Sequence, residues 1–431
     1  MVPHLTTSLT GPLQDLERHV LDRRPDIERW FRSRFAAHEV PFSSSVDLRN
    51  SGFKLAPVDT NLFPGGFNNL NPDFLPLCIH AAMSAIAKQC PDAQKFLLVP
   101  ENHTRNLHYL QSVATLKRIL EGAGLEVRVG SLIPGLAGPT EVETAGGERL
   151  LLEPLERRGD RVGLDGFDPC AVLVNNDLSG GVPAILAGLE QRVVPPLIAG
   201  WSTRRKSQHF VAYDGVAEDF AELVGIDPWL VNPVFAQCGQ VNFAEKAGEE
   251  CLAARVDEVL GQVREKYAEY GITEEPFAIV KADAGTYGMG IMTVKSPDDV
   301  RELNRKQRNK MAVGKEGVEI SEVLIQEGVY TFESINEAVA EPVVYMLDHF
   351  VIGGFYRVHT SRGADENLNS PGMHFVPLAF DTTCFTPDRG ANPDAAPNRF
   401  YAYGVIARLA MLAASIELDD ALNEAEETAT A

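Results

Sequence analysis

The chain has 431 residues, of which 45% are hydrophobic and 23% are charged, and its formal net charge at pH 7 is -21. This length exceeds the size at which one hydrophobic core usually stops growing, so two or more lobes are expected. The negative charge would repel a polyphosphate backbone, which argues against nucleic acid as a partner. No apolar run approaches the roughly 20 residues that span a bilayer, and no secretory signal pattern opens the sequence, so we expect no membrane partner and a cytoplasmic location.

The first half of the chain has the pattern of an α/β domain. Apolar residues at three- and four-residue spacings predict helices within residues 11–40. Residues 95–132 then read as strand, polar loop, amphipathic helix, glycine stop and strand, which is a β-α-β unit. Residues 134–168 predict an excursion of short antiparallel strands, and a second partial unit follows at 170–189. We therefore expect an α/β domain over residues 1–240 that supplies the substrate side.

The pattern changes in the second half. Residues 243–270 predict a long amphipathic helix that ends at Gly271. Strand-like segments and loops alternate after it, and we expect residues 241–415 to form an α+β nucleotide-binding region. The remaining residues, 416–431, are acidic and lack aromatic side chains, so we expect a disordered tail there.

The stretch FAIVKADAGTYGMGIMTV, residues 277–294, places a lone lysine and three glycines between two apolar segments. Backbone N–H groups in such a turn can surround phosphate oxygens while the ammonium neutralises their charge, and glycines would let the turn close over a nucleotide as a flap. An ordinary hairpin with a mobile tip is the alternative, since neither a Walker loop nor the dinucleotide fingerprint is present. Lys281 is thus a candidate catalytic and ATP-binding residue, with the flap residues as further ATP ligands: Gly285, Thr286, Tyr287, Gly288 and Gly290.

Two later segments add polar groups to this arrangement. VLIQEGV ends an apolar strand with Gln326 and Glu327, whose backbone groups and carboxylate could bind an adenine edge and a ribose hydroxyl. EPVVYMLDHFVIGGFYRVH predicts a hairpin whose second strand carries Arg357, a guanidinium that could stabilise charge during phosphoryl transfer. An exposed strand end and an exposed strand arginine are the alternatives.

The order of these elements resembles that of the ATP-grasp ligases over residues 255–385. The resemblance implies an ATP-grasp-like C-terminal half in which ATP and Mg²⁺ bind between two lobes, and a carboxylate is phosphorylated before an amine or thiol attacks it. It would place Lys281 on the phosphates and Glu327 near the adenosine. The Glu-x-Asn metal pair of many such proteins is missing from the late strand, where Asp381 is one further candidate. An oxygen-rich loop, which could equally bind substrate, supplies the metal candidates Glu366, Asn367 and Asn369.

The first half has its own polar segments. Residues 46–74 combine both charges and amides around turns, which suits recognition of an amino acid, although a loop with self-satisfied Asn side chains is the alternative. GWSTRRKSQHF concentrates positive charge that could attract an anion or simply be a solvated cluster. PENHTRN and VNNDLSGG each follow a predicted strand, where ligand loops of open α/β sheets lie. The candidate substrate ligands are Asp59, Asn61, Asn68, Arg204 and Arg205.

Taken together, PVDTNLFPGGFNNLNPDF, PENHTRN, GWSTRRKSQHF, KADAGTYGMGI, EPVVYMLDHFVIGGFYRVH and ENLNSPGMHF resemble the proteobacterial glutamate-cysteine ligase family over nearly the whole chain. The resemblance implies the first step of glutathione synthesis, in which ATP phosphorylates the γ-carboxylate of glutamate and the cysteine amine displaces phosphate. Glutamate, cysteine and ATP are then the expected small molecules, with Mg²⁺ as cofactor. A ligase for another amino acid or dicarboxylate, a kinase and a non-catalytic nucleotide-binding regulator are the alternatives, and the oligomeric state is left open.

Overall fold

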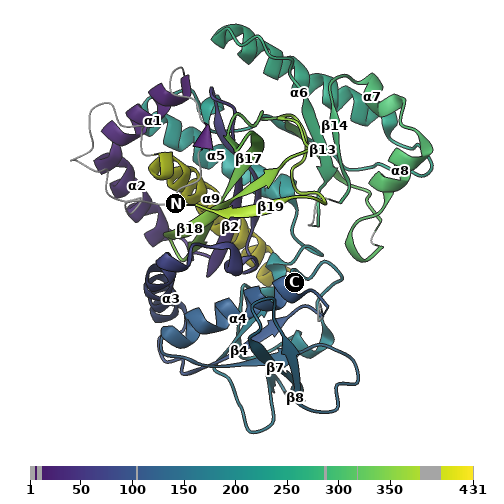
Figure 1. Ribbon diagram of the computed structural model, residues 1–431. Helices are drawn as coiled ribbons and strands as arrows, with labels where there is room; N and C mark the ends of the chain where they lie inside the picture. The colour runs from purple at the N-terminus through teal and green to yellow at the C-terminus, as the bar shows by residue number, and fades with distance from the viewer. Residues whose placement is uncertain are drawn as a thin grey trace.

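The computed structural model describes residues 5–6, 12–102, 105–285, 289–317, 319–378 and 399–430, which form a mixed α/β fold (Figure 1). In this view a seven-stranded sheet lies in the middle, a six-stranded sheet below it and a four-stranded sheet at the upper right. We call these the central, lower and upper sheets. The expectation of a multi-lobe α/β and α+β fold is confirmed.

The lower sheet contains the predicted β-α-β unit. Strand β4 (Lys95–Pro100), helix α4 (Leu107–Gly122) and strand β5 (Glu126–Ser131) follow one another, and β4 pairs parallel with β5. Helix α4 begins where the side chain of Asn106 accepts a hydrogen bond from the backbone N–H of Tyr109, an N-cap. Its apolar side chains pack with those of α3 (Leu75–Gln89) against one face of the sheet.

The remaining strands complete the lower sheet in the order β11-β10-β4-β5-β7-β6. All pairs are parallel except β6 with β7, which belong to the excursion predicted over residues 134–168. A separate hairpin of β8 and β9 lies in the same excursion. The bounds are β6 (Thr140–Glu143), β7 (Arg149–Pro154), β8 (Glu156–Arg158), β9 (Arg161–Gly163), β10 (Ala171–Asn175) and β11 (Arg192–Val194).

The central sheet joins segments that lie far apart in the sequence. Strand β2 (Ser43–Asn50) pairs antiparallel with β3 (Leu55–Asn61) and with β17 (Ala338–Leu347), which forms the predicted hairpin with β18 (Phe350–His359). The expected division at residue 240 is therefore wrong, because long-range strand pairing builds one sheet from both halves. The other strands are β1 (Leu5–Thr6), β16 (Ser334–Ile335) and β19 (His374–Pro377).

The upper sheet has the antiparallel order β12-β15-β13-β14, and β12 comes from the first half of the chain. The predicted long helix covers it as α6 (Glu249–Tyr270) and ends at Gly271, whose φ of 65° is the left-handed conformation of a C-cap glycine. The strands and the two short helices of this lobe are β12 (Phe235–Cys238), β13 (Ala278–Ala282), β14 (Ile291–Val294), β15 (Val323–Glu327), α7 (Asp298–Arg301) and α8 (Arg305–Ala312).

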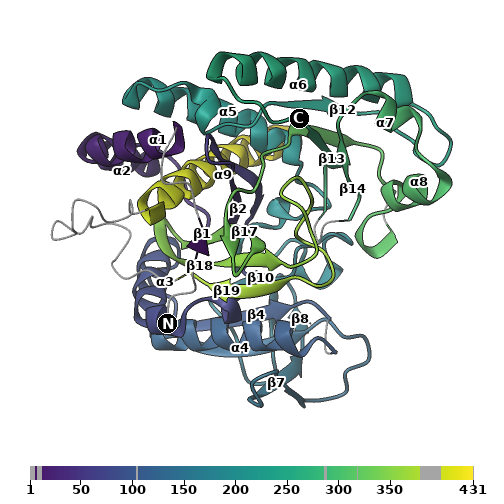
Figure 2. The ribbon, with the colours of Figure 1, turned by 45° about the horizontal axis from the view of Figure 1, so that its top comes forward.

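Helix α9 (Arg399–Thr430) runs through the interior, between the central sheet and helices α1 (Pro12–Asp22), α2 (Arg24–Ala37) and α5 (Lys206–Val224) (Figure 2). One stretch of it, Phe400–Ala425, is long and apolar enough to cross a membrane, yet 94% of its most apolar window is buried inside the protein. The sequence analysis overlooked this stretch, whose apolar surface is covered by other parts of the chain.

The expected disordered tail is part of the same helix. Helix α9 continues through residues 416–430, and the side chains of Glu417 and Leu418 are buried. Although burial raises it, Arg204 and His209 lower the pKa of Glu417 to about 2, so this carboxylate stays charged inside the protein. The structure differs from the expected disorder because the acidic composition hid a carboxylate that has two buried partners, His209 and the cation Arg204, 208 and 213 residues away.

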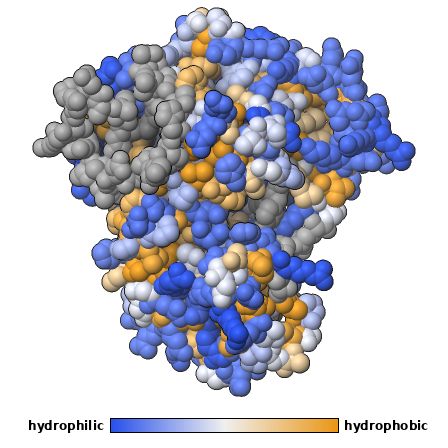
Figure 3. Space-filling view, in the orientation of Figure 1, coloured by the Kyte–Doolittle hydropathy of each residue, from blue (hydrophilic) through white to orange (hydrophobic). Residues whose placement is uncertain are grey.

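Most of the face seen in Figure 3 is hydrophilic, with smaller hydrophobic areas scattered over it, as the composition suggests. Short 3-10 helices occupy several of the connections. They lie at Phe67–Asn69, Pro72–Phe74, Ala184–Leu186, Leu197–Ala199, Pro228–Leu230 and Lys315–Gly317.

Candidate active site

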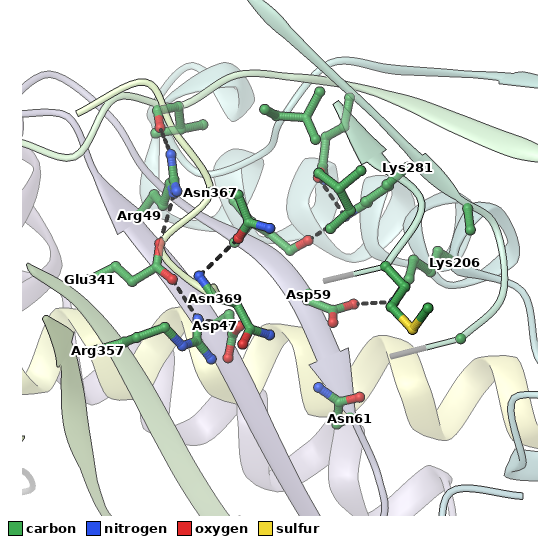
Figure 4. Close-up of a pocket in the computed structure, with 18 of the residues that line it drawn as sticks. Asp47, Arg49, Asp59, Asn61, Lys206, Lys281, Glu341, Arg357, Asn367 and Asn369 are labelled. Atoms are coloured by element: carbon green, nitrogen blue, oxygen red, sulfur yellow. Dashed lines mark hydrogen bonds and ion pairs between the residues drawn. The ribbon is translucent and has the colours of Figure 1, made fainter. Parts of the chain in front are cut away.

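A cavity between the central and upper sheets collects side chains from both halves of the chain (Figure 4). We call it the upper cavity. Strands β2, β3, β13, β14, β15, β17 and β18 contribute to its wall, together with the first residue of α5 and the loop after β18. Its charged and amide side chains belong to Asp47, Arg49, Asp59, Asn61, Lys206, Lys281, Gln326, Glu327, Glu341, Arg357, Asn367 and Asn369.

Lys281 lies on β13 and is buried in the wall of this cavity. Its ammonium donates to two uncharged acceptors, the backbone carbonyl of Val58 at 2.5 Å and the Oε1 atom of Gln326 at 2.8 Å. Burial lowers the pKa of Lys281 to about 7, although Asp59 opposes this shift. An anion that enters the cavity would restore the protonated form.

The flap segment lies between two paired strands, an arrangement common to the flap and to the ordinary hairpin that was its alternative. Strands β13 and β14 pair antiparallel, and the backbone N–H of Ala282 donates to the carbonyl of Gly290 at 2.9 Å. Gly285 and Gly290 have φ values of 98° and 61°, which explains why glycine occupies both ends of the turn. Gly285 lines the upper cavity. The candidates Thr286, Tyr287 and Gly288 lie outside the described residues.

Arg357 is part of a buried charge cluster rather than an exposed strand arginine. It lies directly across the hairpin from Glu341 and donates to the carboxylates of Glu341 and Asp47, while Arg49 donates to the other oxygen of Glu341 (Figure 4). Burial and the nearby Glu341 raise the pKa of Asp47, against the effect of Arg357. The Nε atom of Arg357 is buried and has no hydrogen-bond partner.

Asp59 and Asn61 lie at the end of β3 and face the same cavity. The ammonium of Lys206 donates to Asp59 at 2.6 Å. Although burial raises it, Lys206 and Lys281 lower the pKa of Asp59 to about 2. The Asp59 carboxylate therefore stays charged, paired with Lys206 and close enough to Lys281 for their charges to interact.

Gln326 and Glu327 are both buried but differ in what they offer a ligand. Gln326 has a buried Nε2 atom without a hydrogen-bond partner. Glu327 accepts hydrogen bonds from Lys54 at 2.6 Å, from the indole of Trp229 at 3.2 Å and from the backbone N–H of Val234 at 2.9 Å. Its carboxylate is thus engaged by the protein itself, and its backbone N–H donates to the carbonyl of Val234 at 2.7 Å, so Glu327 contributes to the cavity wall mainly by its position.

The predicted metal ligands separate into two groups. Asn367 and Asn369 line the upper cavity, and the backbone N–H of Asn369 donates to the side-chain oxygen of Asn367 at 2.9 Å. Glu366 instead binds Arg362 and the backbone N–H of Gly363, in a partly exposed position outside the cavity wall. Asp381 lies outside the described residues. Within the described part of the chain, no group of three or more His, Cys, Asp or Glu side chains could hold a metal ion.

Arg204 and Arg205, the predicted anion-attracting pair, are held by the protein's own carboxylates. Arg204 is buried and makes a bidentate ion pair with Glu417, at 2.7 and 3.0 Å. Arg205 donates to Glu322 at 2.7 Å near the surface. Lys206, the next residue, is the member of this cluster that reaches the upper cavity.

A second cavity adjoins the first, between the central and lower sheets, and we call it the lower cavity. Asn68, a predicted substrate ligand, lies in its wall beside Asn69, to which it donates at 3.2 Å. The two cavities share Asn61, Arg357 and Asn369. These three side chains therefore stand at a junction through which a group could pass from one cavity to the other.

Several residues of the two cavities were not among the candidate ligands chosen from the sequence. Asp47 and Arg49 lie in the polar segment 46–74, but they meet Glu341 only where β2 and β17 pair in the folded chain, and Glu101 and Asp177 follow two parallel strands of the lower sheet. The one usable signal was position, since the loops PENHTRN and VNNDLSGG were expected to carry ligand groups. No local pattern marked the carboxylates in β2 and β17.

Comparison with known proteins agrees with the resemblance drawn from the motifs. The family model "GshA: Glutamate-cysteine ligase" matches residues 17–418. The crystal structure of a candidate gamma-glutamylcysteine synthetase from Methylobacillus flagellatus KT is 68% identical, covers 98% of this chain and 99% of that chain, and superposes with a TM-score of 0.90. No curated protein matches.

Two further solved structures are remote. The glutathione synthetase-like effector GSS30 from Globodera pallida is 12% identical, with 83% and 82% coverage and a TM-score of 0.39. D-alanyl-alanine synthetase A from Vibrio cholerae O1 is 10% identical, with 73% and 81% coverage and a TM-score of 0.33. The assignment rests on the family model and the first structure, by which the chain belongs to the glutamate-cysteine ligase family.

Proposed function

We propose that this protein joins the γ-carboxyl group of glutamate to the amine of cysteine, with ATP as co-substrate and γ-glutamyl phosphate as intermediate. Membership in the glutamate-cysteine ligase family supports the overall reaction, the first step of glutathione synthesis. The observation that carries the assignment of the site is a set of buried donors without an anionic acceptor, all on residues that line one cavity.

These donors are the ammonium of Lys281, the Nε2 atom of Gln326 and the Nε atom of Arg357. A buried donor without an acceptor costs roughly 1–3 kcal/mol, a cost that falls on the Gln326 and Arg357 atoms, whereas the ammonium of Lys281 has two neutral acceptors and no anionic one. Phosphate oxygens would satisfy all three. The upper cavity is therefore assigned to the triphosphate of ATP, with the flap hairpin between Gly285 and Gly290 beside it.

The lower cavity is assigned to the amino acids, and the chemistry to the junction. The γ-phosphoryl group moves from ATP to a carboxylate oxygen of glutamate and ADP leaves. The amine nitrogen of cysteine then attacks the acyl carbon and loses a proton as phosphate leaves. Arg357, shared by both cavities, is placed to stabilise charge on the transferring group and on the acyl phosphate. Positioning and charge stabilisation suffice for this reaction, so no protein nucleophile is invoked.

The residues present fit a magnesium ion bound with the nucleotide. Mg²⁺ prefers oxygen ligands and is usually held by one or two carboxylates together with substrate phosphates. The amide oxygens of Asn367 and Asn369 line the upper cavity and would supply such donors. The carboxylates of Asp47 and Glu341 line it too, but they would have to leave Arg357 and Arg49 to bind the ion. When bound there, the ion would neutralise phosphate charge; Glu366, turned toward Arg362, is the weakest member of the predicted set.

The test is ADP release by the purified protein with Mg²⁺ and ATP, offering glutamate alone, cysteine alone and both, with mass spectrometry of the products. We expect γ-glutamylcysteine only when both amino acids are present. A phosphorylated product without amine incorporation would indicate a kinase. Binding of ATP with no ADP in any mixture would leave a nucleotide-binding regulator and overturn the proposal.

A further inference from the structure

The lower cavity contains two carboxylates that the reaction above does not use. Glu101 directly follows β4 and Asp177 lies two residues beyond the end of β10, and these strands pair parallel in register from Ala171 with Phe96 to Asn175 with Pro100. Both loops therefore leave the lower sheet at the same edge, where ligands of open α/β sheets bind. Their side chains are only 8% and 11% exposed.

Hydrogen bonds hold the loops after β4 and β10 in place. The hydroxyl of Tyr109 accepts from the backbone N–H of Glu101 at 2.8 Å and donates to Asn175 at 2.6–2.7 Å, which ties the two strand ends together. One oxygen of Asp177 accepts from the backbone N–H and hydroxyl of Ser179, at 3.0 and 2.7 Å. The other oxygen of Asp177, Oδ2, accepts a hydrogen bond from the ammonium group of a lysine.

That cation is the ammonium of Lys315, which comes from the upper lobe. Lys315 belongs to the segment 305–320 between α8 and β15, and its Nζ atom lies 2.8 Å from Asp177 and 3.0 Å from Glu101. A primary ammonium thus sits between two carboxylates in a position that is 10% exposed.

The wall of the same cavity also includes a group that binds anions. It contains Arg357, the guanidinium that both cavities share. Amides and aromatic side chains complete the wall, among them Asn61, Asn68 and Trp201. A cavity whose wall holds both an ammonium site and an anion donor matches a molecule that carries both groups, as an amino acid does.

We propose that Glu101 and Asp177 form the subsite for the α-ammonium group of an amino-acid substrate, and that Lys315 occupies this subsite when the substrate is absent. The proposal rests on the function proposed above and adds the groups that recognise the amine. Substrate binding displaces the Lys315 ammonium, and the segment 305–320 is released from the lower lobe at the same time. Glutamate and cysteine share the recognised group, and the experiment distinguishes them.

The test measures steady-state KM values for glutamate, cysteine and ATP in Glu101→Gln and Asp177→Asn variants. It also measures inhibition constants of glutarate and 3-mercaptopropionate, which are the two substrates without their amines. Because hydrogen bonds to charged groups contribute about 1.5–3 kcal/mol, we expect KM for one amino acid to rise at least about tenfold. The inhibition constant of its amine-free analogue and KM for ATP should stay within about twofold of the parent.

Lys315→Met should act in the opposite direction. If the lysine competes for the subsite, its removal raises the fraction of protein that is ready to bind, and KM for the same amino acid should fall several-fold. Lys306→Met is the matched control, since Lys306 is an exposed lysine of the same segment, and it should leave KM unchanged. The comparison of Lys315→Met with Lys306→Met still tests the proposal if Glu101→Gln or Asp177→Asn fails to fold.

The possible results distinguish the subsite for glutamate from the subsite for cysteine, and failure of the subsite proposal from failure of the ligase proposal. A change confined to glutamate assigns the subsite to the donor, whose ammonium takes no part in the reaction. A change confined to cysteine assigns it to the acceptor, whose nitrogen would then pass a proton to one of the two carboxylates before it attacks. Equal changes for the amine-free analogues, or a higher KM in Lys315→Met, would overturn the proposal while ADP formation in the parent protein still supported the ligase. Absence of ADP formation in the parent protein would overturn both.

Discussion

Two buried lysines on opposite sides of β15, Lys54 and Lys281, differ in whether a carboxylate lies beside the ammonium group. Lys54 is completely buried, yet its ammonium lies 2.6 Å from the carboxylate of Glu327 and 4.3 Å from the ring centre of Trp229. Lys281 is also buried, but the groups it donates to are neutral. Among the described residues, no carboxylate lies within ion-pair distance of Lys281.

The pKa values reflect this contrast. Burial lowers the pKa of Lys54 to about 8, with Glu327 opposing the shift, and burial lowers that of Lys281 to about 7. A buried charge with its partner holds the structure together, whereas a buried charge without one is a cost that only a ligand can remove. The comparison therefore assigns Lys54 to stability and Lys281 to function.

The largest expected effect is on turnover in Lys281→Met. Removal of a cation that stabilises a transferring phosphoryl group typically costs about 10²–10³-fold or more in rate, so we expect kcat/KM to fall about 10³-fold. The melting temperature should stay the same or rise, because the variant removes a buried charge that lacks a carboxylate partner. ADP release and thermal unfolding measure the two quantities, and Lys306→Met serves as an exposed control. A near-normal kcat/KM in Lys281→Met would show that Lys281 does not have the functional role assigned to it.

Lys54→Met should show the reverse pattern. Breaking one side of a buried ion pair typically costs about 3–5 kcal/mol, because the carboxylate of Glu327 remains buried without its cation. We expect a loss of this size in the free energy of urea unfolding, with a smaller change in kcat for the protein that stays folded. A double variant with Glu327→Gln should recover part of the loss. If Lys54→Met were fully stable but inactive, the division of roles between the two lysines would be wrong.

Local patterns in the sequence predicted the elements near this contrast. Apolar periodicity and glycine stops located the β-α-β unit, helix α6 with its end at Gly271, and both hairpins. The same reasoning placed Lys281, Gln326 and Arg357 on strands, where the structure has them. Periodicity and turn residues act over a few positions, so these inferences needed no knowledge of tertiary contacts.

What the sequence could not supply were partners from distant positions. Arg204 was predicted to attract a substrate, and its actual partner, Glu417, could not be recognised because it lies 213 residues away in the sequence. Likewise, the pairing of β2 with β17, which brings Asp47 near Glu341, joins segments nearly 300 residues apart. Lys54 carried no local sign that Glu327 would neutralise it. Whether a charged residue is structural or functional depended on which charges the fold placed beside it.

The titration of Lys281 gives a smaller, more specific effect. Its pKa in the folded protein, about 7, lies below the 10.5 of an exposed lysine, so between these values the unfolded chain holds a proton that the folded protein lacks. Its contribution to stability therefore falls as the pH decreases toward 7. Bound phosphates should raise this pKa and cause proton uptake.

We expect calorimetry at pH 8, in buffers of different ionisation enthalpy, to show proton uptake of nearly one per ATP bound in the parent protein beyond that in Lys281→Met. Lys54 should contribute none of this difference, because Glu327 stays beside it in both states. Equal proton uptake in the parent protein and in Lys281→Met would show that the nucleotide does not meet this ammonium.

The smallest expected effect is that of Arg205→Gln. Arg205 pairs with Glu322 at 2.7 Å, but both side chains are about a third exposed, and pairs of this kind contribute about 0–1 kcal/mol. KM values for the amino acids should therefore change less than about twofold. A tenfold rise in KM for either amino acid would mean that this arginine leaves Glu322 to bind a substrate carboxylate. The prediction that the segment GWSTRRKSQHF attracts an anionic substrate would then hold for Arg205. A charged side chain that is paired within the protein would be structural only when the pair is buried.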